Sequence, residues 1–250
     1  MTRSRTPSRR DFVRTVGATA TASMLAPGLL PRALEAGAVR DGVLRIGTIG
    51  AGNIGGAVGL KWAQAGHELF FSSRNPEELA DLVRRAGPNA RAGLPAEAAA
   101  FGQVVLVAVP YGAMPQVGRD YAPLMRGKIV IDCGNPYPGR DGPMATEALE
   151  KGTGVASAEY LPGVRLVRAF NAISYRSVES EAHRPGPKVA IPIAGDDAEA
   201  VRVVSELVVD AGFDPVVVGG LARAREFDQG TPVYVEDLTA AQLREALGLR

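Results

Sequence analysis

The pattern of apolar and polar positions from residue 43 onward alternates between two periods. Short, continuous apolar runs are typical of strands buried on both faces, and apolar residues at helical spacing are typical of amphipathic helices. The predicted strands are residues 44–49, 68–72, 103–109, 128–133, 165–170, 188–194 and 214–218. The predicted helices are residues 53–65, 75–87, 96–101, 114–125, 145–151, 197–211 and 239–247. This alternation predicts an α/β fold with a doubly wound parallel sheet, continuous to about residue 220.

The same pattern divides the 250 residues into three parts. Residues 1–38 have a basic start and a weakly apolar stretch, residues 39–225 carry the alternation of strands and helices, and residues 226–250 form a C-terminal extension. We expect the extension to pack either on the sheet or on a partner subunit, so a homodimer stays open as one arrangement.

The first part has the charge and pattern of an export signal. Its six arginines and two acidic residues give it a net charge of +4, whereas the rest of the chain carries −3. Residues 8–13, SRRDFV, resemble the twin-arginine (Tat) signal, and residues 36–38 form a small-x-small cleavage site. The apolar stretch, residues 16–30, is shorter than the roughly 20 residues of a membrane-spanning helix. We therefore predict export by the Tat translocon, in folded form, to the periplasm or another extracytoplasmic space.

Composition excludes several classes of protein. The chain is 46% hydrophobic and 22% charged, which is ordinary for a globular protein, and its net charge of +1 gives no support for nucleic-acid binding. A single cysteine, Cys133, excludes an intrachain disulfide and argues against a thiolate metal cluster. With only His67 and His183 in addition, a histidine-based metal site is not expected.

A glycine-rich loop follows the first predicted strand and opens the first predicted helix. Its residues are Gly50, Ala51, Gly52, Asn53, Ile54 and Gly55. In this strand–loop–helix context, the G-x-G-x-x-G spacing is the dinucleotide fingerprint. Gly50 permits the tight turn, Gly52 lets a pyrophosphate approach the backbone, and Gly55 lets the helix pack close to the strand. The alternative is a glycine-rich turn in an α/β protein that binds no dinucleotide.

The end of the second predicted strand indicates which dinucleotide would bind. An NAD enzyme usually places a carboxylate there to bind the ribose 2′-hydroxyl. This chain has Ser73 and Arg74 instead, and its next carboxylate is Glu77. A guanidinium and a hydroxyl suit a 2′-phosphate, so the sequence favours NADP over NAD. The alternative for Arg74 is a solvated surface arginine.

Four segments in this order resemble the NADPH-dependent deazaflavin (coenzyme F-420) reductase family and its relatives, the reductase domains of STEAP metalloreductases. They are residues 50–55, Ser73–Arg74, Val109–Tyr111 and residues 167–173, and the resemblance covers about residues 43–220. It implies an NAD(P)-binding Rossmann fold and hydride transfer between NADP and a flavin- or deazaflavin-type second substrate.

The resemblance also implies roles for individual residues. The glycine loop would hold the pyrophosphate, and Ser73 and Arg74 would hold the 2′-phosphate. The other cofactor-binding residues that it implies are Val109, Pro110, Tyr111, Asn135, Ala169 and Asn171. Asn171 would lie near the nicotinamide. No residue of this chain matches the family's deazaflavin site, and residues 230–234 have no counterpart in it.

No Ser/His/Asp or Lys/Asp constellation accompanies these motifs, so we predict no catalytic side chain. Hydride transfer between stacked rings depends mostly on positioning, which is consistent with this. Two other interpretations stay open: an NADP-binding module or sensor subunit without turnover, and a hydroxy-acid or imine dehydrogenase. The latter needs a separate helical domain, for which the chain after residue 190 is too short.

Overall fold

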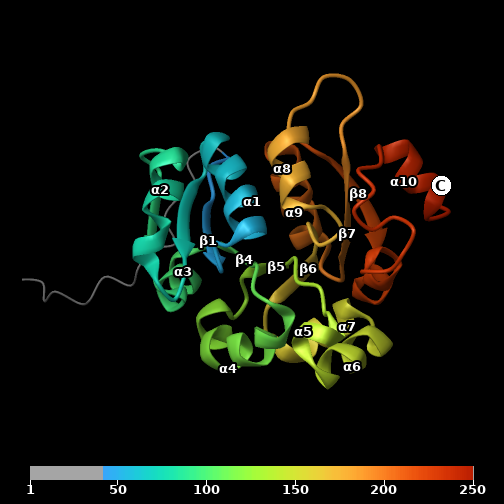
Figure 1. The fold of residues 1–250 in the computed structure, drawn as a ribbon, viewed down its shortest axis with the longest axis horizontal. Coiled ribbons are helices and arrows are strands. Elements are labelled where there is room, and N and C mark those ends of the chain that lie inside the picture. The colour runs from blue at the N-terminus through green and yellow to red at the C-terminus, as the bar shows by residue number, and fades with distance from the viewer. Residues whose placement is uncertain (1–41, 250) are drawn as a thin grey trace, which may run out of the picture. The chain divides into compact units, whose positions relative to one another are not determined.

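An eight-stranded sheet forms the centre of residues 42–249, which are the residues that this computed structural model describes (Figure 1). The spatial order of the strands is β3-β2-β1-β4-β5-β6-β7-β8. In chain order they are β1 (Arg45–Ile49), β2 (Glu68–Ser72), β3 (Ala90–Gly93), β4 (Val104–Val107), β5 (Ile129–Asp132), β6 (Arg165–Arg168), β7 (Ala190–Gly195) and β8 (Asp214–Gly219). The first six strands pair in parallel in the Rossmann-like order, as the sequence predicts.

The seventh strand departs from the predicted parallel sheet. β7 runs antiparallel to β6, with Val167 opposite Gly195 and Arg168 opposite Ala194, and it pairs in parallel with β8. Because the overlap joins the last residues of both strands, the earlier part of β7 continues past the carboxyl end of β6. The sheet is therefore mostly parallel, which confirms the predicted α/β class, and the β6–β7 pair is the exception to the predicted parallel pairing.

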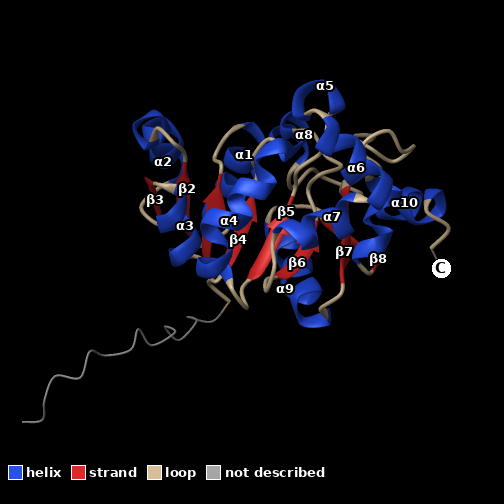
Figure 2. Ribbon diagram, turned by 90° about the horizontal axis from the view of Figure 1, so that it is seen from below, coloured by secondary structure: helices blue, strands red, loops and turns tan. Residues whose placement is uncertain are grey.

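Helices cover both faces of the sheet (Figure 2). The helices are α1 (Asn53–Gln64), α2 (Ala80–Ala86), α3 (Pro95–Phe101), α4 (Met114–Met125), α5 (Pro138–Asp141), α6 (Pro143–Lys151), α7 (Thr153–Tyr160), α8 (Tyr175–Glu181), α9 (Ala198–Asp210) and α10 (Ala240–Ala246). Short 3₁₀ segments are η2 (Pro76–Leu79), η3 (Tyr111–Ala113) and η4 (Leu221–Phe227). The sequence did not predict β3, α5, α7 or α8, which are short elements of weak periodicity.

Alternate residues along the inner strands face two separate apolar cores. On β4, Leu106 packs in the core that α1 and α9 cover, whereas Val105 packs in the core that α4, α6 and α7 cover. The indole of Trp62, in α1, donates a hydrogen bond of 2.7 Å to the carbonyl of Leu207, in α9. This bond ties α1, which begins at the glycine loop, to α9 over the same core.

The C-terminal extension packs on the chain's own sheet. Phe227, Val233 and Leu243 are buried in a third apolar cluster with Val216 and Val218 of β8. Thr239 caps α10, as predicted, and lies in an antiparallel bridge with Val189. The first of the two arrangements predicted for the extension is therefore the observed one, and its predicted start at residue 226 falls inside η4.

The predicted export signal, residues 1–38, lies outside the described residues. Among residues 42–249, no helix has both the length and the apolar character needed to cross a membrane. Within the same range, no group of three or more His, Cys, Asp or Glu side chains is placed to hold a metal ion.

Candidate dinucleotide and hydride-transfer site

Each of the three glycines in the loop stands at a position with a different structural setting. Gly50 has a φ of +91°, in the left-handed region that favours glycine. A Cβ on Gly55 would collide with the carbonyl oxygen of Gly50 and with the side chain of Ala108. A Cβ on Gly52 would have no heavy atom within 4 Å, and the φ of this residue is −75°. Gly52 therefore borders open space, where a pyrophosphate could approach the backbone.

The N-terminus of α1 is open to an anion. Gly52 is its N-cap, so no side chain caps the first turn, and that turn contains no acidic residue. The backbone N–H of Ala51 donates to the carbonyl of Ser72 at 2.8 Å, which ties the loop to the end of β2. Asn53 is exposed in the first turn and Ile54 is half-buried. The free N–H groups and the positive end of the helix dipole suit phosphate oxygens.

Ser73 and Arg74 lie beside this loop, directly after β2. The Ser73 hydroxyl accepts a hydrogen bond of 3.1 Å from the backbone N–H of Asn75. Arg74 is exposed, and among residues 42–249 no carboxylate forms an ion pair with it. Its guanidinium is therefore available to an anion at the position where the ribose of a bound dinucleotide would lie.

A cavity of about 380 Å³ lies at the carboxyl ends of β5 and β6. Its lining includes Ile54 from α1, the amides of Asn135 and Asn171, and the rings of Tyr137, Tyr175 and Tyr234. Because Ile54 belongs to the glycine loop, the cavity adjoins the dinucleotide cradle. Aromatic walls with a few convergent polar groups are typical of a site for a flat ring.

Two amides face each other in this cavity. Asn171 is 2% exposed, and its Nδ2 donates to the carbonyl of Phe227 at 3.3 Å and to Oδ1 of Asn135 at 3.4 Å. Nδ2 of Asn135 donates to the backbone carbonyl of Asn171 at 2.8 Å. Oδ1 of Asn171 is buried and has no hydrogen-bond partner among residues 42–249. Such an atom is costly unless a ligand satisfies it, and the carboxamide N–H of a nicotinamide is a donor of the right kind.

An ion network that the sequence analysis missed supports these amides. Arg168 is fully buried, with its Nη1 at 2.6 Å from Oδ2 of Asp132 and its Nη2 at 3.4 Å from Oδ1 of Asp228. It also donates to the carbonyl of Gly134 at 2.9 Å, in the loop that carries Asn135. Burial lowers the Arg168 pKa, but the two carboxylates outweigh it, so the pKa is raised and the guanidinium stays charged. The sequence did contain a signal for this network, because Asp132 and Arg168 are charged residues within mostly apolar predicted strands.

Two residues that the resemblance places on the cofactor path have buried side chains. Tyr111 is 0% exposed, and its hydroxyl lies 2.9 Å from Oγ of Ser157, which donates to Asp132 at 2.6 Å. Burial and the charge of Asp132 raise the Tyr111 pKa. Ala169 is also 0% exposed. The Tyr111 phenol belongs to the network beneath the site, and a role for this residue on the cofactor path stays a prediction.

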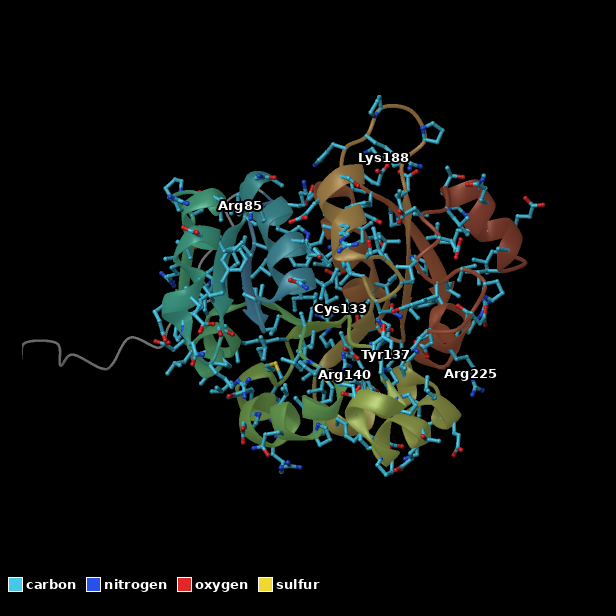
Figure 3. All side chains as sticks on the ribbon, viewed as in Figure 1. Arg85, Cys133, Tyr137, Arg140, Lys188 and Arg225 are labelled. Atoms are coloured by element: carbon cyan, nitrogen blue, oxygen red, sulfur yellow. The ribbon has the colours of Figure 1, made fainter. Side chains whose placement is uncertain are left out.

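The neighbouring predicted residues do border the site. Val109 contacts the glycine loop, since its Cγ1 would be 3.0 Å from a Cβ on Gly50, and Pro110 is exposed directly after it. Cys133 is 4% exposed and burial raises its pKa to about 12, so it is a buried neutral thiol, as predicted. Figure 3 shows Cys133 and Tyr137 in the same central region of the molecule.

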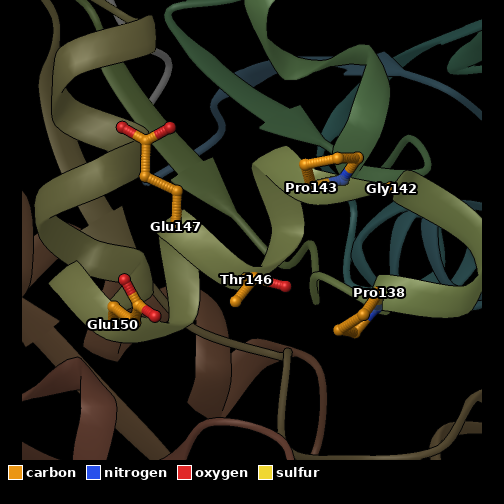
Figure 4. Close-up of a pocket in the computed structure, with 6 residues that line it drawn as sticks. All are labelled: Pro138, Gly142, Pro143, Thr146, Glu147 and Glu150. Atoms are coloured by element: carbon orange, nitrogen blue, oxygen red, sulfur yellow. The ribbon is translucent and has the colours of Figure 1, made fainter.

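A second hollow, of about 570 Å³, lies on α5 and α6 (Figure 4). Its lining includes the carboxylates of Glu147 and Glu150 and contains no lysine or arginine. None of the predicted cofactor residues takes part in it. Its acidic character disfavours the phosphates of a dinucleotide, so the cavity beside the glycine loop is the better candidate.

Comparison with known proteins agrees with this geometry. Residues 45–136 match the family described as NADP oxidoreductase, coenzyme F420-dependent. The chain is 28% identical over 206 residues to the F420-dependent NADP reductase of Methanothermobacter marburgensis, covering 76% of this chain and 90% of that protein. It is 32% identical over 171 residues to the metalloreductase STEAP3 of Rattus norvegicus, covering 66% of this chain but only 31% of that protein.

The chain is an F420-dependent NADP reductase-like oxidoreductase. A solved structure of a hypothetical protein from Sinorhizobium meliloti has the same fold, with a TM-score of 0.67 and 25% identity over 79% of this chain and 95% of that one. In this oxidoreductase the family match contains the glycine loop, Ser73–Arg74 and Asn135. Asn171 and the C-terminal extension lie beyond the residues that this family model matches.

Proposed function

We propose that this oxidoreductase transfers a hydride between NADP(H) and a deazaflavin- or flavin-type acceptor. The observation that carries the proposal is the aromatic-lined cavity beside the glycine loop, whose lining includes the amides of Asn135 and Asn171. This arrangement supplies amide groups for a carboxamide at one side and flat walls for a second ring.

The residues fit NADP(H) along its whole length. The open space at Gly52 and the uncapped N-terminus of α1 would receive the pyrophosphate, and Arg74 would receive the 2′-phosphate. Asn171 would accept from the carboxamide, which fixes the face that the nicotinamide turns to the cavity. A dinucleotide lacking the 2′-phosphate would lose the contact with Arg74.

When bound, the reduced nicotinamide supplies the hydride. The chain's own contribution is orientation and exclusion of water. Asn135 and Phe227 hold the Asn171 amide in one orientation, because both accept from its Nδ2. The rings of Tyr137, Tyr175 and Tyr234 enclose the space in which the acceptor would stack. Fixing two rings in contact geometry supplies most of the rate of such a transfer.

Stopped-flow absorbance at the NADPH band tests the proposal, with a deazaflavin or a flavin as acceptor. Oxidation of NADPH supports hydride transfer, whereas tight binding of NADPH without oxidation supports the alternative of a binding module. Asn171→Ala should lower kcat/KM about tenfold or more, because the carboxamide loses a buried partner worth about 1–3 kcal/mol. Gln116→Ala, which removes an exposed amide on α4 outside the cavity, is the matched control.

We also propose that the protein is exported through the Tat pathway. The proposal rests on the sequence of residues 8–13, where Arg9 and Arg10 precede Asp11 and Phe12, and on the mildly apolar stretch that follows. Replacing Arg9 and Arg10 together by lysine should leave the protein in the cytoplasm, as cell fractionation would measure. Export of this variant at the normal level would contradict the proposal.

A further inference from the structure

A strained valine lines the cavity on the side of the C-terminal extension. Val235 has a φ of +58°, in the left-handed region, and it is β-branched. Such a residue is a genuine outlier there, because its two γ-carbons crowd the backbone. It is 38% exposed and belongs to the cavity lining. Burial in a core therefore does not explain why its side chain is held in this conformation.

The segment that carries Val235, residues 231–237, is fastened to the rest of the site at three points. The backbone N–H of Val235 donates to the carbonyl of Ala172 at 3.0 Å. The hydroxyls of Tyr234 and Tyr137 lie 2.7 Å apart. The hydroxyl of Ser177 donates to Oδ2 of Asp237 at 2.7 Å. These bonds overdetermine the backbone and hold the strain in place.

These hydrogen bonds hold two side chains of the segment, Tyr234 and Val235, in the wall of the cavity. Tyr234 is half-buried, and burial together with the hydrogen bond to Tyr137 raises its pKa, so the phenol stays neutral. The hydrogen bond between the two hydroxyls holds the ring of Tyr234 beside that of Tyr137, which follows β5 and is far from Tyr234 in the sequence. Val235 adds an isopropyl group beside it.

We propose that Val235, with Tyr234 clasped by Tyr137, is the acceptor-side wall of the cavity and determines which planar ring can stack there. The inference rests on the proposed function, since it concerns the second substrate of the same site. A strained backbone at a cavity wall is retained where the side chain it presents is used. Asn171, which would bind the nicotinamide, has no part in this selection of the acceptor ring.

Val235→Gly separates the role of the side chain from the stability of the fold. Glycine adopts a φ of +58° without strain, so the variant should unfold at the same temperature or higher. It should nevertheless change the ratio of kcat/KM between a narrow and a bulky deazaflavin or flavin by fivefold or more. The dissociation constant of NADPH should stay within twofold, because the residues proposed to receive its phosphates, Gly52 and Arg74, do not line this cavity.

His183→Gly is the matched control. His183 has a φ of +59° but is exposed in a loop outside the cavity, so its replacement relieves the same kind of strain without touching the wall. It should leave the acceptor ratio unchanged. An unchanged ratio in Val235→Gly as well would overturn the inference.

The clasp is tested by Tyr137→Phe, Tyr234→Phe and the double variant. Each keeps the ring and removes one hydroxyl of the pair. Because both hydroxyls form one bond, the KM for the acceptor should rise by similar factors in each single variant and no further in the double variant. If the rise in KM in the double variant equals the product of the rises in the two single variants, the two hydroxyls act independently and the shared bond is contradicted.

Failure of the inference and failure of the proposed function are distinguishable. If the unmodified protein oxidises NADPH with these acceptors but Val235→Gly does not alter their ratio, the inference fails and the proposed function stands. If the unmodified protein binds NADPH and reduces none of them, the proposed function fails and the inference fails with it.

Discussion

The guanidinium of Arg168 and the carboxylate of Asp132 form a fully buried ion pair, 2.6 Å apart, beneath the carboxyl ends of β5 and β6. Asp228 approaches the same guanidinium from the C-terminal extension. Together the three side chains join β5 and β6, which are followed by the loops of Asn135 and Asn171, to the C-terminal extension. A buried pair of this kind positions its surroundings more than it stabilises them.

Removing one partner should be strongly destabilising. Arg168→Met leaves Asp132 and Asp228 buried without their cation, and we expect a loss of about 3–5 kcal/mol in the free energy of unfolding. Urea denaturation measures it. Arg202→Met, which removes two exposed ion pairs on α9, should cost far less, because solvent screens exposed pairs. Equal losses in the two variants would show that burial of the Arg168 pair is energetically unimportant.

Gly52→Val should abolish NADPH binding in a folded protein. The φ of Gly52 is −75° and the space at its Cβ is open, so the fold tolerates valine while the new side chain occupies the pyrophosphate position. Calorimetric titration with NADPH measures the effect. Gly55→Val is the informative contrast, because it collides with Gly50 and should lower stability as well. Retained NADPH affinity in Gly52→Val would mean that the loop is only a turn.

Arg74→Ala should weaken NADPH by roughly 10- to 100-fold and leave NADH nearly unchanged. A charge-assisted contact with the 2′-phosphate is worth about 1.5–3 kcal/mol, and NADH lacks that phosphate. The measurement is the ratio of the two dissociation constants. Arg84→Ala, an exposed arginine paired with Asp81 on α2, is the control. If Arg74→Ala weakens both dinucleotides equally, Arg74 supports the fold rather than the phosphate.

The loop that carries Tyr137 should lose stability in acid. Hydrogen bonds from Arg140, with a further one from the backbone of Tyr137, lower the Asp141 pKa to about 2. A lowered folded-state pKa stabilises the protein above the unfolded value, so this contribution declines from about pH 4 down to about pH 2. Asp141→Asn should flatten that part of the stability profile, measured by thermal unfolding. A profile as steep as that of the unmodified protein would exclude Asp141 as its source.

Much of the nucleotide half of the site could be predicted from the sequence. The glycine loop, Ser73 and Arg74 are contiguous with one strand and one helix, and parallel pairing of β1 and β2 brings their ends together. Local spacing is therefore sufficient there. Their geometry, with open space at Gly52 and an exposed guanidinium at Arg74, suits a dinucleotide.

The other half depends on contacts between distant parts of the chain. Asn171 reaches Asn135 and Phe227, and Tyr137 reaches Tyr234, across separations that no periodicity encodes. The place of Tyr111 on the cofactor path, which the resemblance implies, stays a prediction, and its buried hydroxyl contacts Ser157 in the core.

The sequence by itself determined the fold class, the dinucleotide loop and the residues at the end of β2, because each depends on neighbours along the chain. Only the tertiary structure decided the antiparallel β7, the buried Arg168 network and the strained wall at Val235. Those features arise where the C-terminal extension closes over the ends of β5 and β6, so their energetics depend on burial and on partners far away in sequence.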